Sequence, residues 1–157
     1  MGEPAPYDTD AWPSHSSYFG IIDLASLPKD RYYLYKSQWN TYSPTLHVLP
    51  HWTWPGREGE VTPIFVYTSY PEAEVFINGV SCGRQRFGQS EAPMVGKFDV
   101  ASWGCAPQKE VLSRYRLMWM HTVYEPGELR VVAYNEAGEA VAEQVVRTAG
   151  KPHHLVA

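Results

Sequence analysis

Turn signals that recur after Trp39 constrain the fold more than any other feature of the sequence. Pairs such as Pro55-Gly56 and Asn78-Gly79 are separated by short apolar runs, with a turn signal about every 8 to 12 residues. These runs are rich in β-branched and aromatic residues, which favour strands. About six to eight short strands at this spacing predict an immunoglobulin-like β-sandwich. We therefore expect a mainly β fold.

The expected strands are read from apolar runs and from alternation. Residues 63–69 form a continuous apolar run, and residues 73–78 alternate before Asn78-Gly79, the strongest hairpin signal in the chain. Residues 115–124 are predicted to form one long strand. One of its faces is expected to carry Leu117, Trp119, His121 and Val123. The other expected strands are 46–54, interrupted by Pro50, and then 80–86, 95–100, 129–135 and 140–148.

The stretch from Ser16 to Trp39 has a different character. Ser16–Leu24 is apolar and is expected to be extended, whereas residues 31–39 are predicted to form a short aromatic helix. Pro28 is expected at the first helical position, with Ser26 or Leu27 as the cap. The packed side of the helix is expected to carry Arg31, Leu34, Tyr35 and Gln38, flanked by Tyr32 and Trp39.

Charge and hydropathy exclude several classes of partner. The net charge of −4 provides no basic surface for nucleic acid, and no apolar run approaches the length of a membrane span. The first residues have neither the positive region nor the apolar core of a signal peptide. Cys82 and Cys105 could pair, but two separate thiols are the preferred interpretation.

The sequence lacks the common motifs of catalytic, phosphate-binding and metal-binding sites. There is no phosphate-binding glycine loop, no serine elbow and no ligand spacing for a metal, so no cofactor and no metal are expected. Aromatic residues make up 14% of the chain, which suits both a core and the stacking of sugars on flat rings. Trp52 and Trp54 are predicted to share one strand face. They could form a sugar platform or contact a neighbouring domain.

Several long segments resemble a known enzyme family. Residues 16–39, SSYFGIIDLASLPKDRYYLYKSQW, resemble the segment that closes the catalytic (β/α)₈ barrel in family 2 glycoside hydrolases of the β-galactosidase type. Residues 46–60, LHVLPHWTWPGREGE, and 66–84, VYTSYPEAEVFINGVSCGR, resemble the immunoglobulin-like domain that follows the barrel. Residues 124–152 resemble its final hairpin. The resemblance covers nearly the whole chain.

The resemblance implies three segments: the tail end of the barrel (1–44), an immunoglobulin-like sandwich (45–150) and the start of a linker or next domain (151–157). In this family the two catalytic glutamates lie upstream of the matched part, so no catalytic residue is assigned and the chain alone is predicted to be inactive. Four residues of the loop near the sugar pocket are candidates to line that pocket in the intact enzyme: Glu3, Trp12, His15 and Ser16.

The same resemblance implies the partners. They are the remaining domains of a retaining exo-β-glycosidase and, in the intact enzyme, carbohydrate; a periplasmic or extracellular location is expected for that enzyme. The preferred hypothesis is therefore a non-catalytic part that buttresses the barrel and positions neighbouring domains. An independent carbohydrate-binding β-sandwich is the alternative, and it requires exposed coplanar rings on one sheet face.

Overall fold

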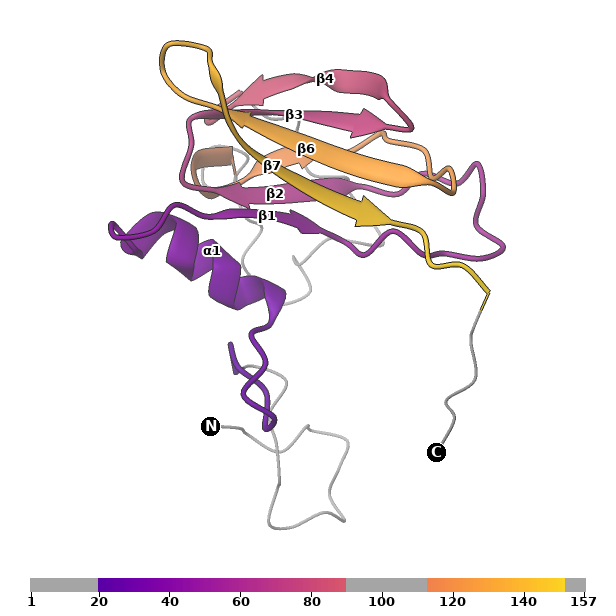
Figure 1. The fold of residues 1–157 in the computed structure, drawn as a ribbon, viewed down its shortest axis with the longest axis horizontal. Coiled ribbons are helices and arrows are strands. Elements are labelled where there is room, and N and C mark those ends of the chain that lie inside the picture. The colour runs from indigo at the N-terminus through magenta and orange to yellow at the C-terminus, as the bar shows by residue number, and fades with distance from the viewer. Residues whose placement is uncertain (1–19, 90–112, 152–157) are drawn as a thin grey trace, which may run out of the picture.

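The computed structural model describes residues 20–89 and 113–151, which form a β-sandwich with a helix beside it (Figure 1). The strands lie in two antiparallel sheets of order β1-β2-β5 and β4-β3-β6-β7. The elements are α1 (Asp30–Trp39), β1 (Leu46–Leu49), β2 (Ile64–Thr68), β3 (Glu72–Ile77), β4 (Val80–Arg86), β5 (Leu117–Trp119), β6 (Glu128–Tyr134) and β7 (Ala140–Arg147).

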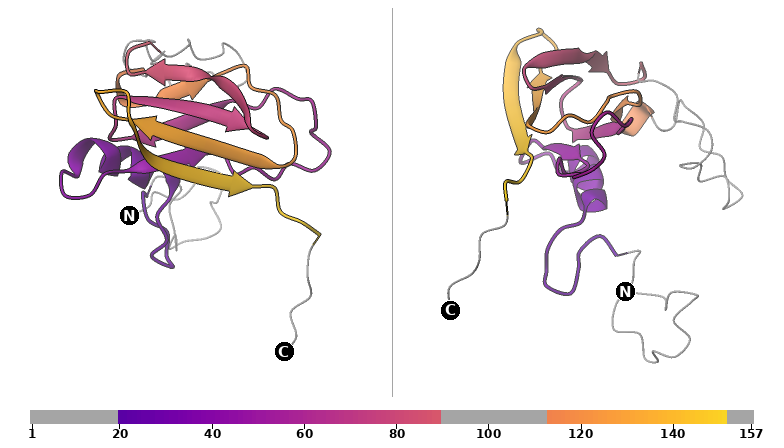
Figure 2. Two further views of the ribbon diagram at one scale, coloured as in Figure 1. Left: turned by 45° about the horizontal axis from the view of Figure 1, so that its top comes forward. Right: turned by 90° about the vertical axis from the view of Figure 1, so that its right-hand side faces the viewer.

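This arrangement confirms the mainly β prediction. If β1, β2 and β3 are lettered A, B and C, β4 is lettered C′, and β5, β6 and β7 are lettered E, F and G, the sheets read A-B-E and C′-C-F-G. The second sheet therefore contains the C-F-G strands of immunoglobulin domains. The two sheets face each other, as the end-on view shows (Figure 2). Between them the fully buried core includes Ile64, Val66, Val75, Leu117, Leu129 and Val131.

The hairpin predicted at Asn78-Gly79 is present between β3 and β4. Asn78 adopts a φ of 49° and Gly79 a φ of 82°, the left-handed conformation that a tight hairpin turn needs. The Asn78 side chain also receives a hydrogen bond from the amide of Glu128 at 2.8 Å, which ties the turn to the start of β6. The predicted alternation in β3 and β6 is confirmed by their burial.

The long strand predicted over residues 115–124 is wrong. Only Leu117–Trp119 form a strand, and the chain bends directly afterwards. Leu117 and Trp119 are buried whereas His121 and Val123 are exposed, so the four residues do not share one strand face. The Thr122 hydroxyl donates instead to the Thr62 carbonyl, and Val123 makes an isolated bridge. The strand expected at 95–100 lies outside the described residues.

The helix predicted at residues 31–39 is confirmed, but its start differs. It begins at Asp30 with Lys29 as the cap, and Pro28 lies before it in an isolated bridge with Ile22. The Asp23 carboxylate accepts hydrogen bonds from the amides of Ala25 (2.9 Å) and Leu27 (2.8 Å), so a side-chain-stabilised turn replaces the expected cap. In residues 20–24 only Ile22 is paired, so the expected extended run is not found there.

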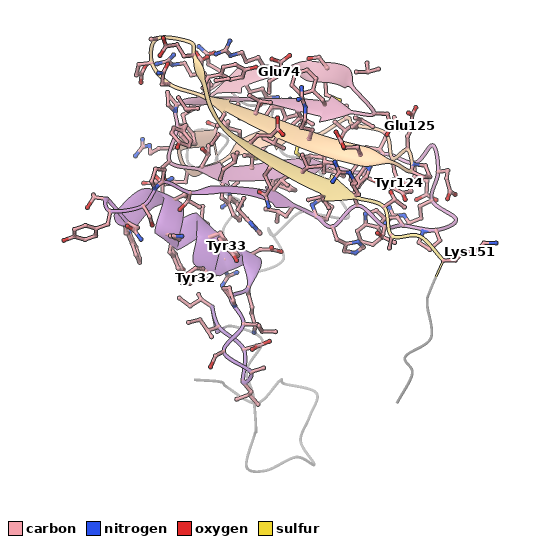
Figure 3. The ribbon with its side chains drawn as sticks, viewed as in Figure 1. Tyr32, Tyr33, Glu74, Tyr124, Glu125 and Lys151 are labelled. Atoms are coloured by element: carbon pink, nitrogen blue, oxygen red, sulfur yellow. The ribbon has the colours of Figure 1, made fainter. Side chains whose placement is uncertain are left out.

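The chain leaves the sandwich beyond β7 through a hydrogen-bonded anchor at Thr148. Its hydroxyl donates to the Trp52 carbonyl at 2.6 Å and accepts from the amide of Gly127 at 2.9 Å. Its own amide donates to the Gly127 carbonyl at 2.8 Å. Lys151 lies at the opposite end of the molecule from α1 (Figure 3). Of the helices in the described ranges, none is long and apolar enough to cross a membrane.

Candidate functional site

Trp52 lies in the core, and this corrects its interpretation as a sugar platform. Strand β1 ends at Leu49, so Trp52 and Trp54 do not share a strand face. The Trp52 ring has no exposed surface, packs edge-on against Tyr124, and donates its indole N–H to the Glu125 carbonyl at 2.9 Å. A ring without an exposed face cannot stack on a sugar.

Trp54 is half-buried, and other side chains lie over its ring. The His51 imidazole stacks on it with ring centroids 4.0 Å apart, and the Arg57 guanidinium lies 5.1 Å from its centroid. Its backbone amide donates to the Tyr124 hydroxyl at 3.2 Å, which fixes this loop to the core. Sugar stacking would have to displace these neighbours. A contact with a neighbouring domain stays a proposal for Trp54.

Two other aromatic rings lie on the outer face of the four-stranded sheet, and arginines lie over both. The Arg84 guanidinium is 3.5 Å from the Tyr134 centroid, and the Arg130 guanidinium is 4.7 Å from that of Phe76. These cation–π contacts occupy the ring faces that a carbohydrate would need. The sheet face therefore offers no open aromatic platform at these two rings.

The carboxylates of Asp23, Glu58 and Glu60 each hold local structure. Glu60 pairs with Arg57 at 2.8 Å, Glu58 accepts from the Gly56 amide at 3.2 Å, and Asp23 holds the turn before α1. Within residues 20–89 and 113–151 no three His, Cys, Asp or Glu side chains are placed to hold a metal. These carboxylate contacts therefore hold turns and strands in place.

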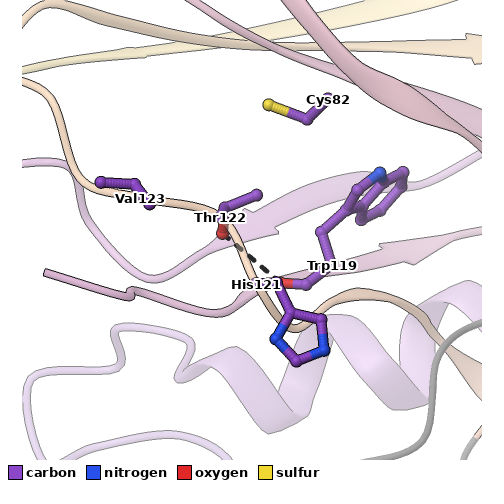
Figure 4. Close-up of a pocket in the computed structure, with 5 residues that line it drawn as sticks. All are labelled: Cys82, Trp119, His121, Thr122 and Val123. Carbon is purple, nitrogen blue, oxygen red and sulfur yellow. Dashed lines mark hydrogen bonds between the residues drawn. The ribbon is translucent and has the colours of Figure 1, made fainter. Parts of the chain in front are cut away.

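A pocket of about 300 Å³ opens between β4 and the bend after β5 (Figure 4). Burial raises the pKa of the Cys82 thiol, and the charge of Glu125 raises it further, although a hydrogen bond with the Ile77 backbone opposes both. A raised pKa keeps the thiol protonated and weakly nucleophilic. The His121 ring points away from Cys82, so the two form no nucleophile–base pair (Figure 4). Cys105 lies outside the described residues.

Aromatic and polar contacts join α1 to the three-stranded sheet of the sandwich, and we call this contact region the joint. Val48 and Val66 face the core, so their neighbours His47 and Tyr67 face outward from the three-stranded sheet, where α1 lies. The His47 imidazole stacks on Tyr33 with centroids 3.9 Å apart, and its Nε2 lies 2.8 Å from Asp30 Oδ1.

A second connection lies one helical turn further on. Ser37, the only helix residue in α1 that is buried, accepts on its carbonyl a hydrogen bond from the Ser69 hydroxyl at 3.1 Å. Ser69 in turn accepts from the Thr45 amide at 3.1 Å. Asp30, Tyr33 and Ser37 recur at helical spacing, so they form the side that packs. This corrects the packed side predicted from Arg31, Leu34, Tyr35 and Gln38.

The pocket-loop candidates Glu3, Trp12, His15 and Ser16 lie outside the described residues, so their role stays a prediction. Sequence reasoning missed the His47–Asp30 contact. The signal that could have found it is a histidine at an outward position of a predicted strand, with an acidic residue in the first turn of the preceding helix. Residues 17 positions apart become neighbours only when the helix folds back.

Comparison with known proteins places the chain. The family described as "Domain of unknown function (DUF4982)" matches residues 59–142. The chain belongs to this family. The match spans more than half of the chain and most of both sheets, from before β2 into β7.

Relatives of the DUF4982 domain are glycosidases. The chain is 40% identical over 156 residues to the beta-galactosidase BoGH2A of Bacteroides ovatus, covering 99% of this chain and 15% of that protein. It is 34% identical over 137 residues to a putative beta-glucuronidase of Formosa agariphila, covering 87% of this chain and 11% of that protein. A beta-glycosidase structure from Bacteroides vulgatus matches with a TM-score of 0.66 and 34% identity, covering 90% of this chain and 15% of that one.

These comparisons confirm the resemblance to family 2 glycoside hydrolases. The DUF4982 chain spans only 15% and 11% of the curated relatives that it matches. The β-sandwich therefore corresponds to a small part of much longer enzymes.

Proposed function

We propose that this chain is a non-catalytic supporting part of a retaining exo-β-glycosidase of the β-galactosidase type. In this proposal residues 1–44 are the tail end of the catalytic barrel, residues 45–150 are the sandwich, and residues 151–157 begin a linker or next domain. The function is to buttress the barrel and to hold neighbouring domains in a fixed orientation. Carbohydrate is bound by the intact enzyme.

The joint at His47 is the observation that supports this role best. A hydrogen bond between His47 and Asp30 and a stacked ring hold the start of α1 on the sandwich, and the Ser69–Ser37 hydrogen bond holds its last turn. Contacts at both ends of a helix prevent it from pivoting on the sheet. The sandwich can therefore fix the orientation of whatever α1 is attached to.

The alternative of an independent sugar-binding module has less support. Trp52 is buried, and Trp54, Phe76 and Tyr134 have a histidine or arginine against the ring. Exposed coplanar rings on one sheet face, which that alternative requires, are not found at these positions. The supporting role needs no such platform.

A chimera of BoGH2A tests the proposal. The 156 matched residues of that β-galactosidase are replaced by this chain, and hydrolysis of nitrophenyl β-galactoside is compared with the parent enzyme and with a deletion of the same residues. We expect the chimera to be active, because the chain supplies the missing support. The deletion variant is expected to lose activity, since the barrel would lack its last helix and its buttress.

The chain alone is assayed in parallel on nitrophenyl β-galactoside and β-glucuronide. No turnover above a protein-free blank is expected, because in this proposal the catalytic glutamates lie upstream of the chain. Turnover by the isolated chain, or an inactive chimera beside an active parent, would overturn the proposed function.

A further inference from the structure

The turn between β3 and β4 contains the only asparagine–glycine pair of the chain, Asn78-Gly79. The other two asparagines, Asn40 and Asn135, precede threonine and glutamate. Asparagine is one of the thermolabile residue types. In an asparagine–glycine pair the glycine nitrogen can attack the asparagine side chain, because glycine has no side chain of its own to hinder the approach. Asn78 is therefore the asparagine of this chain that is most reactive toward deamidation.

The structure holds the Asn78 side chain by both of its polar atoms. Its Oδ1 accepts a hydrogen bond from the Glu128 amide at 2.8 Å, and its Nδ2 donates to the Pro126 carbonyl at 3.2 Å. The Asn78 amide also donates to the Glu128 carbonyl at 2.8 Å. These bonds join the turn to the chain that enters β6, the strand beside β3 (Figure 1). We call Asn78 together with residues 126–128 the Asn78 clamp.

Gly127 supplies the space that the Asn78 clamp needs. A Cβ on this residue would lie 2.0 Å from Asn78 Oδ1 and 2.8 Å from its Cγ, so any other residue here would displace the asparagine side chain. Gly127 also has a φ of 137°, which other residues rarely adopt. Thr148 holds Gly127 in turn, through hydrogen bonds to its amide and its carbonyl. The clamp therefore depends on the loop before β6 and on the chain just after β7.

We propose that Asn78 is a site of spontaneous deamidation and that opening of the Asn78 clamp controls the reaction. The Gly79 nitrogen forms a bond to Asn78 Cγ while the Cγ–Nδ2 bond breaks, and Nδ2 leaves as ammonia with the proton from the Gly79 nitrogen. The product is a five-membered imide ring. Water then opens the ring: cleavage at Cγ leaves aspartate, and cleavage at the backbone carbonyl leaves isoaspartate. Water is the only co-reactant.

Hydrogen bonding protects Asn78, because the residue is exposed and burial does not shield it. Ring closure moves Cγ onto the Gly79 nitrogen, which carries Oδ1 and Nδ2 away from the backbone groups that hold them. Both side-chain hydrogen bonds must therefore break before the ring forms. A reaction that proceeds only from an opened state is slowed in proportion to the rarity of that state.

Either product weakens the contact between the β3–β4 turn and β6. In aspartate the oxygen that replaces Nδ2 cannot donate to the Pro126 carbonyl, so two acceptors face each other. Isoaspartate instead adds a carbon atom to the backbone of a tight turn in which Ile77 lies opposite Val80. Deamidation therefore makes the opening of the Asn78 clamp permanent.

Peptide mapping by mass spectrometry measures the conversion of Asn78 in the full chain at mildly alkaline pH. We expect conversion to be at least about tenfold slower in the folded chain than in the same chain unfolded in guanidinium chloride, because the reaction waits for opening. Asn40 and Asn135 should remain unconverted in both samples over the same time, since neither precedes glycine. Equal rates for Asn78 in the folded and unfolded chain would overturn the proposal.

Gly127→Ala is the decisive variant, because its methyl group takes the place of the Asn78 amide. It should raise the rate in the folded chain toward that of the unfolded chain. Gly138→Ala is the matched control: Gly138 has a φ of 79° in the β6–β7 turn, so alanine is strained there without displacing Asn78. The control should leave the rate unchanged. An equal rise in both variants would assign the reaction to global unfolding and overturn the role of the clamp.

Thr148→Val keeps the proposal testable if Gly127→Ala does not fold. It removes the hydroxyl that holds the Gly127 amide, and it should raise the deamidation rate of the folded chain at least about twofold. Hydrogen exchange is the independent measurement, because the Asn78 and Glu128 amides both donate within the clamp. Their exchange should accelerate by the same factor as deamidation. Faster exchange at both amides without faster deamidation would show that the clamp does not control the reaction.

Asn78→Asp reproduces the aspartate product. We expect this variant to melt at a lower temperature than the wild type and to exchange the Glu128 amide faster, because the bond to the Pro126 carbonyl is lost. A variant that matches the wild type in both measurements would contradict the permanent opening inferred for the product.

Discussion

The outer faces of the two sheets carry different kinds of side chain. On the four-stranded sheet, Glu72 pairs with Arg84 at 2.8 Å and with Arg86 at 2.7 Å, and Arg130 pairs with Glu143 at 3.2 Å. The three-stranded sheet instead carries aromatic side chains on its outer face, including Tyr67, and α1 covers part of that face.

The difference shows how one sandwich can have one outer face in solvent and the other covered by a helix. Charged side chains that pair on this sheet keep their hydration, and two of the arginines also cover the rings of Tyr134 and Phe76. An aromatic outer face needs a further layer, which α1 supplies here. The helix therefore covers the sheet whose outer face carries aromatic rings such as Tyr67, and the predictions below test this contrast.

The largest difference is expected between two tyrosines on opposite outer faces. Tyr67→Ala should lower the free energy of unfolding by about 3 kcal/mol, because the ring is only 7% exposed and its loss leaves a cavity beneath α1. Tyr134→Ala should cost about 1 kcal/mol, since the ring lies mainly under Arg84 in contact with water. Urea unfolding of the isolated chain measures both, and equal costs would remove the contrast.

Alkaline pH should act on the same two tyrosines. Burial raises the pKa of Tyr67, and Asp30 raises it further, while Arg116 and Arg31 lower it. Its folded-state pKa thus lies above the ordinary value of 10.0, so its stabilising effect is complete below pH 10 and is lost as pH rises through the folded pKa.

The check is stability measured from pH 8 upward in Tyr67→Phe, which removes the titrating hydroxyl. This variant should lose less stability above pH 10 than the wild type. Burial and a hydrogen bond to Glu74 raise the pKa of Tyr134 in the same direction, so Tyr134→Phe is the matched comparison. A wild-type profile unchanged by Tyr67→Phe would contradict the assignment.

The smallest effect is expected on the ionic face. Glu72→Gln should lower the free energy of unfolding by about 0.5 to 1 kcal/mol at low salt, because two arginines lose a shared carboxylate. The cost should shrink as NaCl is raised to 1 M, since exposed pairs are screened. The cost of Tyr67→Ala should persist in salt, and a salt-independent cost for Glu72→Gln would mean that packing dominates there.

Local signals predicted the four-stranded sheet well. The Asn-Gly turn between β3 and β4 requires left-handed backbone, and the alternation of Ala73, Val75 and Ile77 has one solvated face to contrast with the buried one. In β5 that contrast is missing, because Leu117, Met118 and Trp119 are all buried. Alternation then says nothing about where the strand ends.

The candidate site was less predictable because its contacts are tertiary. The sequence indicated an aromatic helix needing a partner, but which side packs depends on His47 and Ser69, residues 17 and 32 positions from their partners Asp30 and Ser37. Trp52 and Trp54 were misplaced for a local reason, since the strand ends before Pro50 and alternation no longer applies. Their burial is decided by Tyr124, 70 or more positions away.

The anchor at Thr148 has a mechanical consequence. Tension applied to the chain at Lys151 passes through Gly150 to the hydrogen bond between the Ala149 amide and the Thr53 hydroxyl. It then reaches the bonds that Thr148 makes with Trp52 and Gly127. Those bonds must break before the pull can peel β7 from β6. The load is therefore taken up at two separate loops at once, and a single-molecule pulling trace should show a force peak that Thr148→Val weakens.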